Sequence, residues 1–382
     1  MAKMRNNLIK RGNTWSYAIR VADPATGESK QHMRGGYATQ AEAAAARDAA
    51  RVADAQGTFV LPTTQTLADY LAEWLDSLNL KPKTIQGYRY NVERYIVPRI
   101  GGTRLRDLRA ARLSKFYKDL AVNGGRNGDP LGHSSIESVH RTLRAALSAA
   151  VKADLLGSNP ASKAVLPPKP SQSIVRRRAL EICELRLLLD AAAEHRLGPL
   201  VHLAAATGMR RGELLFLRWR HLDLENRRVT IEGSRSDVAG RSTEGTPKSG
   251  KSRTLTFDEE TAAVMARHRE RQARERVTAD EVWHQADDYV FRTEDGRPLR
   301  PDSASKIVGN LCEMAGIRKA TLHDMRHTHA TLMLTDGVPV HEVSARLGHR
   351  DPTVTMTTYA HVLRQREDGH GDRFGSILAA SG

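Results

Sequence analysis

The chain has 382 residues, of which 59 are Lys or Arg and 44 are Asp or Glu, so its formal charge is +15. This length, with 40% hydrophobic residues, allows two or three domains with cores of their own and excludes global disorder. The sequence has no long apolar run and no signal-peptide core, and its two cysteines exclude a disulfide framework and a four-cysteine zinc site. We therefore expect a soluble cytoplasmic protein with a polyanionic partner and no membrane partner.

The excess of positive charge is confined to one part of the chain. Residues 179–382 carry 30 basic and 30 acidic residues, so the whole excess lies in residues 1–178. This asymmetry indicates a region that holds a polyanion such as DNA, joined to a neutral domain. A surface charge that serves only solubility is the alternative explanation.

Residues 1–62 are predicted to form a small three-stranded sheet backed by one helix. Alternate residues from Trp15 to Val21 are apolar, which is typical of a half-buried strand. A second extended stretch is expected over 30–34, where the pair Gly35-Gly36 would end it. Thr39 and Glu42 have the spacing of a capping box before an Ala-rich helix.

Residues 63–160 are predicted to be entirely helical. Apolar residues recur at helical spacing after Thr66, after Pro82 and over 136–151. Residues 161–178 then contain three prolines and no acidic residue, which indicates a semi-extended basic linker. The linker ends in three candidate contacts to a DNA backbone, Arg176, Arg177 and Arg178.

Residues 179–382 are predicted to form a mixed α+β domain. Helices are expected over 200–217, 258–276, 301–315, 322–336 and 339–347, and strands over 228–232 and 253–257 on either side of a polar, Gly-rich loop. No Walker loop, GxGxxG turn, GxSxG elbow or HExxH helix occurs. NTP hydrolysis, dinucleotide redox chemistry and the commonest hydrolase mechanisms therefore lose support.

Five stretches of this domain combine cations, imidazoles and a late tyrosine. They are 207–214 with Arg210 and Glu213, 246–253 with Lys248, 322–328 with His323, Asp324 and Arg326, 347–349 with His349, and 357–361 with Tyr359. A glycine break should place Arg210 near a helix start, and His323 and Arg326 should share one face of a helix because they lie three residues apart. Each stretch alone is a weak indication of function, but the five in this order form one specific signature.

In this order the chain resembles the tyrosine recombinases, the phage-type integrases. Six residues match the motif positions of that family: Arg210, Lys248, His323, Arg326, His349 and Tyr359. The resemblance covers nearly the whole chain and implies a mainly α, multidomain fold. It implies an arm-type DNA-binding domain (1–62), a core-binding domain (63–160), the linker (161–178) and a catalytic domain with a C-terminal tail (179–382).

The resemblance implies that Tyr359 attacks a DNA phosphate and forms a 3′-phosphotyrosyl link, which a second 5′-hydroxyl reverses. Planar guanidiniums suit the charge on the non-bridging oxygens, so this is the role expected of Arg210 and Arg326. Lys248 is the expected general acid, with Lys251 as the alternative.

His323 would assist deprotonation of the tyrosine or bind phosphate, and His349 would donate a hydrogen bond to it. Glu213 and Asp324 would orient cations or cap helices, or be solvated helix charges. The arrangement needs neither metal nor other cofactor. His323, His327 and His329 do not suggest a metal site, because the last of them points away from the first on a helix.

As partners, the resemblance implies double-stranded DNA at crossover and arm-type sites, a homotetramer on DNA, a host DNA-bending factor and an excision-directionality factor. The sheet of the arm domain is expected to enter a major groove, with Arg20, Lys30 and Arg34 as candidate contacts. In the tail, Phe374, Ile377 and Leu378 are expected to dock on a neighbouring protomer.

The function implied is site-specific recombination that integrates and excises a phage or mobile element. A chromosome-dimer-resolving recombinase and a type IB topoisomerase use the same chemistry and remain alternatives. A DNA-binding regulator that has lost activity is an alternative of another class. Binding of residues 1–62 to DNA distinct from the crossover site would favour the integrase.

Overall fold

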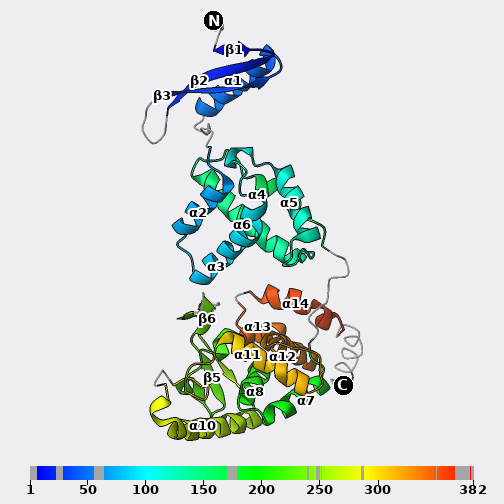
Figure 1. Ribbon diagram of the computed structural model, residues 1–382. Coiled ribbons are helices and arrows are strands. Elements are labelled where there is room, and N and C mark those ends of the chain that lie inside the picture. The colour runs from blue at the N-terminus through cyan, green and yellow to red at the C-terminus, as the bar shows by residue number, and fades with distance from the viewer. Residues whose placement is uncertain are drawn as a thin grey trace. The chain divides into compact units, whose positions relative to one another are not determined.

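In the computed structural model the chain divides into two compact units, residues 1–171 and 172–382 (Figure 1). The structure describes residues 7–22, 29–55, 64–169, 179–238, 241–246, 250, 252–284, 288–349, 351–365 and 379. These residues are mainly helical, with small antiparallel sheets, so the predicted fold class is confirmed. None of the helices in the described part has both the length and the apolar character that a bilayer crossing requires.

The first unit begins with a three-stranded sheet and one helix. The elements are β1 (Leu8–Arg11), β2 (Thr14–Ala22), β3 (Ser29–Tyr37) and α1 (Gln40–Ala55), and the strand order is β1-β2-β3. Tyr17, Ile19 and Val21 of β2 pack against Ala43 and Ala50 of α1, as the apolar alternation predicts. Glu42 accepts from the backbone of Ala38 and Thr39, and the Thr39 hydroxyl accepts from Glu42 N, which is the predicted capping box.

The prediction that Gly35 and Gly36 end the second extended stretch is wrong, because β3 continues through both of them to Tyr37. Gly35 faces Ser16 of β2. A Cβ on Gly35 would lie 2.4 Å from Ser16 Oγ, so the glycine permits close approach of the two strands instead of breaking one.

A helical bundle follows, with a core of its own. Its elements are α2 (Leu67–Ser77), α3 (Pro82–Asn91), a π-helical turn (Val92–Ile96), α4 (Val97–Ile100), a 3₁₀ turn (Leu105–Asp107), α5 (Ala110–Asn123), α6 (His133–Lys152) and a 3₁₀ turn (Pro160–Lys163). The apolar stripe of α2 is buried, and Thr66 and Asp69 cap its start reciprocally. Each fully buried leucine, such as Leu67 or Leu71, contributes about 2 kcal/mol through burial. The helices predicted from the sequence do not include α5.

The beginning of the predicted linker belongs to this bundle. Ala161 is fully buried in the bundle core, and Ala164 and Leu166 pack against it. The backbone N–H of Val165 donates to Ser114 Oγ at 2.9 Å. Residues 161–166 are therefore not a free tether, because their small apolar side chains complete the core. Arg176, Arg177 and Arg178 lie outside the described residues.

The second unit is a helical domain that carries two small sheets. Its elements are α7 (Ile182–Ala193), α8 (Gly198–Thr207), α9 (Arg211–Leu214), a 3₁₀ turn (Trp219–His221), β4 (Leu222–Asp223), β5 (Arg228–Ile231), β6 (Ser234–Val238), β7 (Arg241–Gly245), β8 (Arg253–Thr256), α10 (Glu259–Ala279), a 3₁₀ turn (Asp280–Val282), α11 (Pro301–Met314), α12 (Leu322–Asp336), α13 (Val340–Leu347) and α14 (Pro352–Gln365). One sheet has the order β4-β5-β8, and β6 pairs with β7.

Most predicted helices of this unit are present, but three features differ from the prediction. The stretch expected to be helical over 200–217 divides at the predicted glycine break, because Gly208 adopts a left-handed conformation (φ 62°) that ends α8, but its second piece, α9, ends already at Leu214. The polar stretch after β5, predicted as a loop, contains the hairpin β6–β7. The helices α7 and α14 were not assigned from the sequence.

Two clusters of buried side chains position the functional residues. The larger cluster joins α7, α8, α10 and α11 with the β4-β5-β8 sheet. The smaller one joins α12, α13 and α14 and includes Leu334, Leu347 and Tyr359. The helices α12, α13 and α14 contact one another and lie together in Figure 1.

Candidate active site

Two helix ends meet at Arg326. The helix α8 ends at Gly208 and α13 ends at Gly348, both glycines with left-handed φ angles (62° and 67°). Helix C-termini present unpaired carbonyls that carry partial negative charge. Arg326, on α12 and 4% exposed, donates Nη1 to the Gly208 carbonyl and Nη2 to the Leu347 carbonyl, each at 2.8 Å. One guanidinium therefore ties both helix ends together.

Arg210 reaches the same place from the start of α9. Its Nη2 donates to the carbonyl of Gly348 at 2.9 Å, and its Nη1 donates to Glu213 Oε1 at 2.8 Å. The carbonyls that Arg210 and Arg326 bind on α13 belong to adjacent residues, so the structure brings these two predicted cations together. The Arg210 side chain is 24% exposed, which makes it the more accessible of the two.

Glu213 is the carboxylate of this cluster and is almost fully buried. It accepts from the backbone N–H and Nη1 of Arg210 and from both terminal nitrogens of Arg253. Burial acts to raise the pKa of Glu213, but the bonds and charge of Arg253, followed by those of Arg210, outweigh burial and leave the pKa below its ordinary value. Glu213 is therefore ionised at neutral pH.

The cluster has more positive than negative charge. Burial, and then the like charge of Arg210, lower the pKa of Arg326 to about 9, whereas Glu213 opposes the shift. Arg326 is still protonated at neutral pH. Arg210 and Arg253 bind the one carboxylate, and Arg326 interacts with it through its charge. Three guanidiniums with one carboxylate are an arrangement suited to an additional anion.

Tyr359 lies on α14, where its backbone departs from helical geometry (φ −109°, ψ 15°). Its side chain is 4% exposed, and its ring stacks on His327 with centroids 4.8 Å apart. Burial raises the pKa of Tyr359 to about 12, against the opposing charge of Arg326. The hydroxyl is therefore protonated at neutral pH and needs a proton acceptor before it can act as a nucleophile.

His349 follows the end of α13, and its Nδ1 lies 2.7 Å from Thr355 Oγ1. Burial lowers its pKa to about 4, and the charges of Arg326, Arg210, Arg253 and His323 act in the same direction. The imidazole is therefore neutral at neutral pH, and its surroundings include three other predicted site residues. His323 itself is exposed at the first turn of α12.

Lys248 and its alternative Lys251 lie outside the described residues, but both flanks of their stretch are held in place. Before it, Glu244 of β7 forms an ion pair with Arg218 at 2.9 Å and accepts from the Tyr289 hydroxyl. After it, Arg253 binds Glu213. The stretch that carries Lys248 therefore starts from one anchored strand and returns to the arginine cluster.

Comparison with known proteins decides the family. Residues 178–366 match the phage integrase family, residues 66–121 match the phage integrase N-terminal SAM-like domain, and residues 7–48 match an arm DNA-binding domain. The chain belongs to the phage integrase family, the tyrosine recombinases. Enzymes of this family cleave and rejoin DNA, so the predicted enzyme class is confirmed.

Relatives of this recombinase match it along most of its length. A XerC-like tyrosine recombinase of Caldanaerobacter subterraneus subsp. tengcongensis is 28% identical over 321 residues, which are 79% of this chain and 81% of the relative. An integrase of Saccharopolyspora erythraea is 26% identical over 82% of each chain.

Solved structures share the fold. The Tn1549 transposon integrase in complex with transposon right end DNA covers 81% of this recombinase and 100% of that chain at 18% identity, with a TM-score of 0.68. A lambda integrase tetramer bound to a Holliday junction covers 93% of this recombinase and 96% of that chain at 18% identity, with a TM-score of 0.58.

The sequence assigns no role to two arginines at this site, Arg253 of the cluster and the neighbouring Arg346. The sequence predicts Arg253 only as the last residue of the 246–253 stretch and the first residue of a strand, and it does not single out Arg346. Arg346 donates Nε to His329 Nε2 at 3.0 Å and Nη2 to the carbonyls of Ala206 and Thr256. His329 Nδ1 lies 2.8 Å from the Ala205 carbonyl, so this pair binds the end of α8. For Arg253 the available signal was its place five residues after Lys248.

Asp324 caps α12. Its described contacts are with Thr321 and include no cation. Its Oδ2 accepts from the backbone N–H and the hydroxyl of Thr321, whose hydroxyl accepts from Asp324 N. Because Asp324 fixes the first turn of α12, it positions His323 and Arg326 on that helix. Glu213, by contrast, directly contacts Arg210 and Arg253.

The three candidate contacts of the arm domain do not share one face of its sheet. Arg34 pairs with Tyr17, and Lys30 pairs with Val21, so both register positions lie on the face that packs against α1. Arg20 pairs with Gln31 on the opposite face, where Arg11, paired with Thr14, is a further exposed cation outside the predicted set. The side chain of Lys30 lies outside the described part. The face opposite α1 therefore offers the exposed side chains of Arg11 and Arg20.

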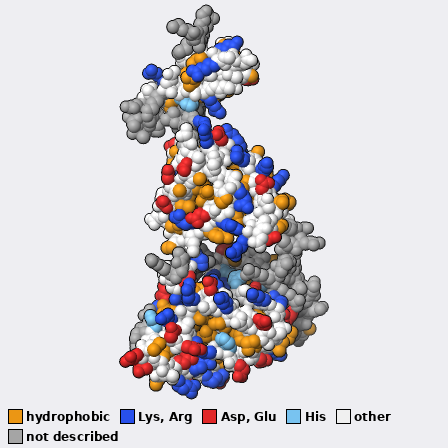
Figure 2. Space-filling model, viewed as in Figure 1, with side chains coloured by type: hydrophobic (Ala, Val, Ile, Leu, Met, Phe, Trp, Pro, Cys, Tyr) orange, Lys and Arg blue, Asp and Glu red, His pale blue; other side chains and the backbone are white. Residues whose placement is uncertain are grey.

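Surface charge is not gathered into one patch on the visible face of the helical bundle. Figure 2 shows basic and acidic side chains interspersed there. On this face, therefore, the charged side chains identify no single contact surface. The predicted tail contacts Phe374, Ile377 and Leu378 lie outside the described residues.

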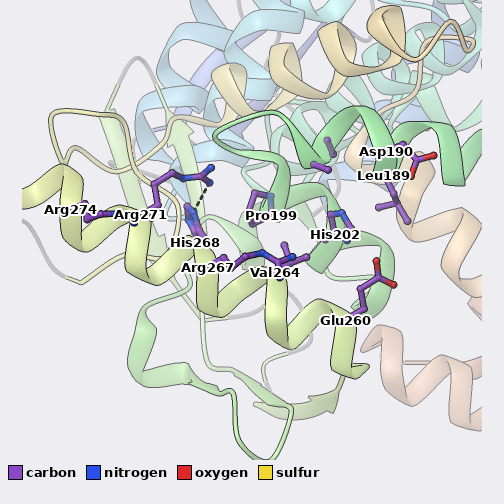
Figure 3. Close-up of a pocket in the computed structure, with 12 residues that line it drawn as sticks. Leu189, Asp190, Pro199, His202, Glu260, Val264, Arg267, His268, Arg271 and Arg274 are labelled. Atoms are coloured by element: carbon purple, nitrogen blue, oxygen red, sulfur yellow. Dashed lines mark hydrogen bonds between the residues drawn. The ribbon is translucent and has the colours of Figure 1, made fainter.

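A separate cavity of about 350 Å³ lies between α7, α8 and α10. Figure 3 shows His202 on α8 facing it, with Arg267, His268 and Arg271 on α10. Arg271 donates to the Arg196 carbonyl and to His268 Nδ1, so it is engaged within the fold. None of the six predicted catalytic residues is among the described residues that line this cavity, which makes it distinct from the arginine cluster.

We expect the free energy of unfolding of the second unit to decrease as the pH falls from about 6.5 to about 4. Burial lowers the pKa of His268 and of His329 to about 4, whereas an unfolded histidine titrates near 6.5. The unfolded chain therefore binds protons first, at a cost of up to about 1.4 kcal/mol per pH unit for each histidine. Urea unfolding followed by Trp fluorescence at several pH values measures this slope.

His341→Gln is the matched control for that slope, since the side chain of His341 is 73% exposed. It should leave the dependence on pH unchanged, whereas His268→Gln should reduce it. A free energy of unfolding that stays constant over this interval would contradict the expectation.

Proposed function

We propose that this recombinase is a site-specific integrase that integrates and excises a phage or mobile element through a 3′-phosphotyrosyl intermediate on Tyr359. One observation carries the proposal. Arg210 and Arg326 bind adjacent carbonyls at the end of α13, and the charge of Arg326 acts on the buried Tyr359. Paired guanidiniums beside a tyrosine suit attack on a phosphodiester.

The proposed step is balanced in atoms and protons. The Tyr359 oxygen forms a bond to phosphorus as the bond from phosphorus to the 5′-oxygen breaks. The tyrosine proton leaves with the assistance of His323, and Lys248 gives a proton to the 5′-oxygen. Attack by a 5′-hydroxyl of the second duplex reverses the step and restores the phosphodiester, so no external energy source is needed.

The arginines supply charge stabilisation in this scheme. The non-bridging oxygens gain negative charge in the transition state, and Arg210 and Arg326 offset it through paired donors. The neutral imidazole of His349 donates a hydrogen bond to the same phosphate. Glu213 keeps Arg210 oriented, and Asp324 holds the first turn of α12.

The proposed partners are DNA at two kinds of site and further copies of the chain. Residues 63–160 and 179–382 would hold the crossover site, and residues 1–62 would hold arm-type sites through Arg11 and Arg20. Exchange of four strands requires four active sites, so we propose a homotetramer on DNA, with a host DNA-bending factor and an excision factor as further partners. The place of action is the cytoplasm of a bacterial host.

A chromosome-dimer-resolving recombinase is the second candidate, because one relative is XerC-like. The match to an arm DNA-binding domain over residues 7–48 favours the integrase, since a second kind of DNA site serves to distinguish element from host. The two candidates share the chemistry and differ only in the sites that they join.

Covalent capture on a library of random duplexes tests the proposal. With chelator present, we expect the full chain to form detergent-resistant complexes with one class of duplex, the crossover site, in which a 3′-end is attached to protein. A second class, the arm site, should be retained only without detergent. The double variant Arg11→Ala, Arg20→Ala should lose the second class and keep the first. Attachment through a 5′-end, or dependence on metal, would refute the mechanism.

A further inference from the structure

Arg253, the first residue of β8, enters the arginine cluster as its third guanidinium. Its Nη2 and Nη1 donate to the two carboxylate oxygens of Glu213, at 2.8 and 3.2 Å. Its Nε donates to the carbonyl of Arg346 at 3.0 Å. Three bonds from one planar group therefore fix β8 to α9 and to the end of α13.

Arg253 and Arg210 share one acceptor, Glu213, and their other acceptors lie two residues apart in the chain. Glu213 Oε1 accepts from Arg210 Nη1, and the Gly348 carbonyl accepts from Arg210 Nη2. Gly348 lies two residues after Arg346, so the turn over 346–348 carries one bond from each arginine. The orientation of the Arg210 guanidinium therefore depends on Glu213, which Arg253 binds directly, and on the turn over 346–348, which Arg253 binds at the Arg346 carbonyl.

Packing leaves Arg253 little room for another position. A Cβ on Gly348 would lie 2.7 Å from Arg253 Nη1, so the glycine admits the guanidinium as well as the left-handed turn. The Arg253 side chain is 12% exposed, half the exposure of Arg210. All three side-chain nitrogens of Arg253 donate to protein acceptors, so its geometry suits a role that acts through its neighbours.

We propose that Arg253 is a positioning residue for strand cleavage. It holds Glu213 and the 346–348 turn so that the Arg210 guanidinium is already oriented when a phosphate arrives. A charge-stabilising donor contributes most when its orientation costs nothing during the reaction. This inference rests on the proposed function, in which Arg210 offsets charge on the scissile phosphate.

The test compares two duplexes that carry the captured crossover site. One has an ordinary scissile phosphate. The other has a methylphosphonate, in which a methyl group replaces one non-bridging oxygen and removes the charge that Arg210 would offset. In single-turnover cleavage by the full chain, Arg253→Lys and Arg253→Gln should each slow the phosphate reaction roughly 10- to 100-fold. On the methylphosphonate the loss should shrink to about 2-fold, because less charge needs a correctly placed donor.

Arg228→Lys is the matched control, because Arg228 is exposed at the opposite end of the same β5–β8 pair. It should cleave both duplexes at the wild-type rate. Each cleavage rate is divided by the concentration of folded protein, which is measured by titration of DNA-binding sites. A variant that folds poorly is therefore not mistaken for one that cleaves slowly. Equal losses on the two duplexes, or no loss on the phosphate, would overturn the proposal.

Arg210→Ala separates this inference from the proposed function. The decrease in cleavage rate caused by Arg210→Ala should also be smaller on the methylphosphonate than on the phosphate. If the decrease with Arg210→Ala is smaller there, but the decrease with the Arg253 variants is the same on both duplexes, the inference about Arg253 alone is wrong. If Arg210→Ala cleaves the phosphate at the wild-type rate, the charge-stabilising role of Arg210 is wrong, and the inference about Arg253 is wrong with it.

Discussion

Tyr359→Phe should abolish covalent attachment to DNA, a decrease of at least about 10⁴-fold in the rate of complex formation. The substitution removes the oxygen that forms the bond to phosphorus and keeps the ring that packs on His327 and on the cluster of α12, α13 and α14. The free energy of unfolding should therefore change by no more than about 1 kcal/mol. Suicide duplexes analysed under denaturing conditions measure attachment, and binding without detergent shows that the variant still holds DNA.

Tyr90→Phe is the control for this prediction, because Tyr90 is 57% exposed on α3 in the other unit. It should form covalent complexes at the wild-type rate. If Tyr359→Phe still becomes attached to the 3′-end of a suicide duplex, another group is the nucleophile and the assignment of Tyr359 is wrong.

The elements that could be predicted from the sequence are those whose determinants lie close together in the chain. Thr66 with Asp69, and Thr321 with Asp324, cap helices across three residues, so the starts of α2 and α12 were predictable. The hairpin β6–β7 was not, because polar pairs such as Ser236 and Thr243 provide no apolar alternation. The alternation of apolar and polar residues that indicates a strand is therefore absent from this stretch.

The sequence indicates which residues form the candidate site, but it does not indicate which of them contact one another. The order of cations, imidazoles and tyrosine indicated the family and its catalytic positions. Arg210 and Gly348 are 138 residues apart, and Arg253 and Glu213 are 40 apart. Such pairs depend on how helices pack, which local spacing does not determine. Arg253 is therefore visible only as a cation in the sequence and as a holder of Glu213 in the structure.

Arg326→Lys should reduce the rate of cleavage by roughly 10³-fold while DNA affinity stays within about 3-fold. Lysine keeps the charge, but it has no planar pair of donors. It therefore cannot bind the carbonyls of Gly208 and Leu347 and also present a donor to a phosphate. Arg326→Ala should be worse, since it leaves two buried carbonyls without this partner, at about 1 to 3 kcal/mol each in the free energy of unfolding. Single-turnover cleavage and urea unfolding measure the two effects separately.

Arg318→Lys is the matched control for Arg326→Lys. Arg318 also ties two segments together, through a bond to the Ala179 carbonyl at 2.9 Å and an ion pair with Glu184, but it takes no part in the arginine cluster. If Arg318→Lys slows cleavage as much as Arg326→Lys does, the loss reports a general loosening of the fold. A selective loss at Arg326, with stability near that of the control, requires the guanidinium to act in the reaction. Two donors fixed on helix ends in the free protein would then be the ones that meet the phosphate.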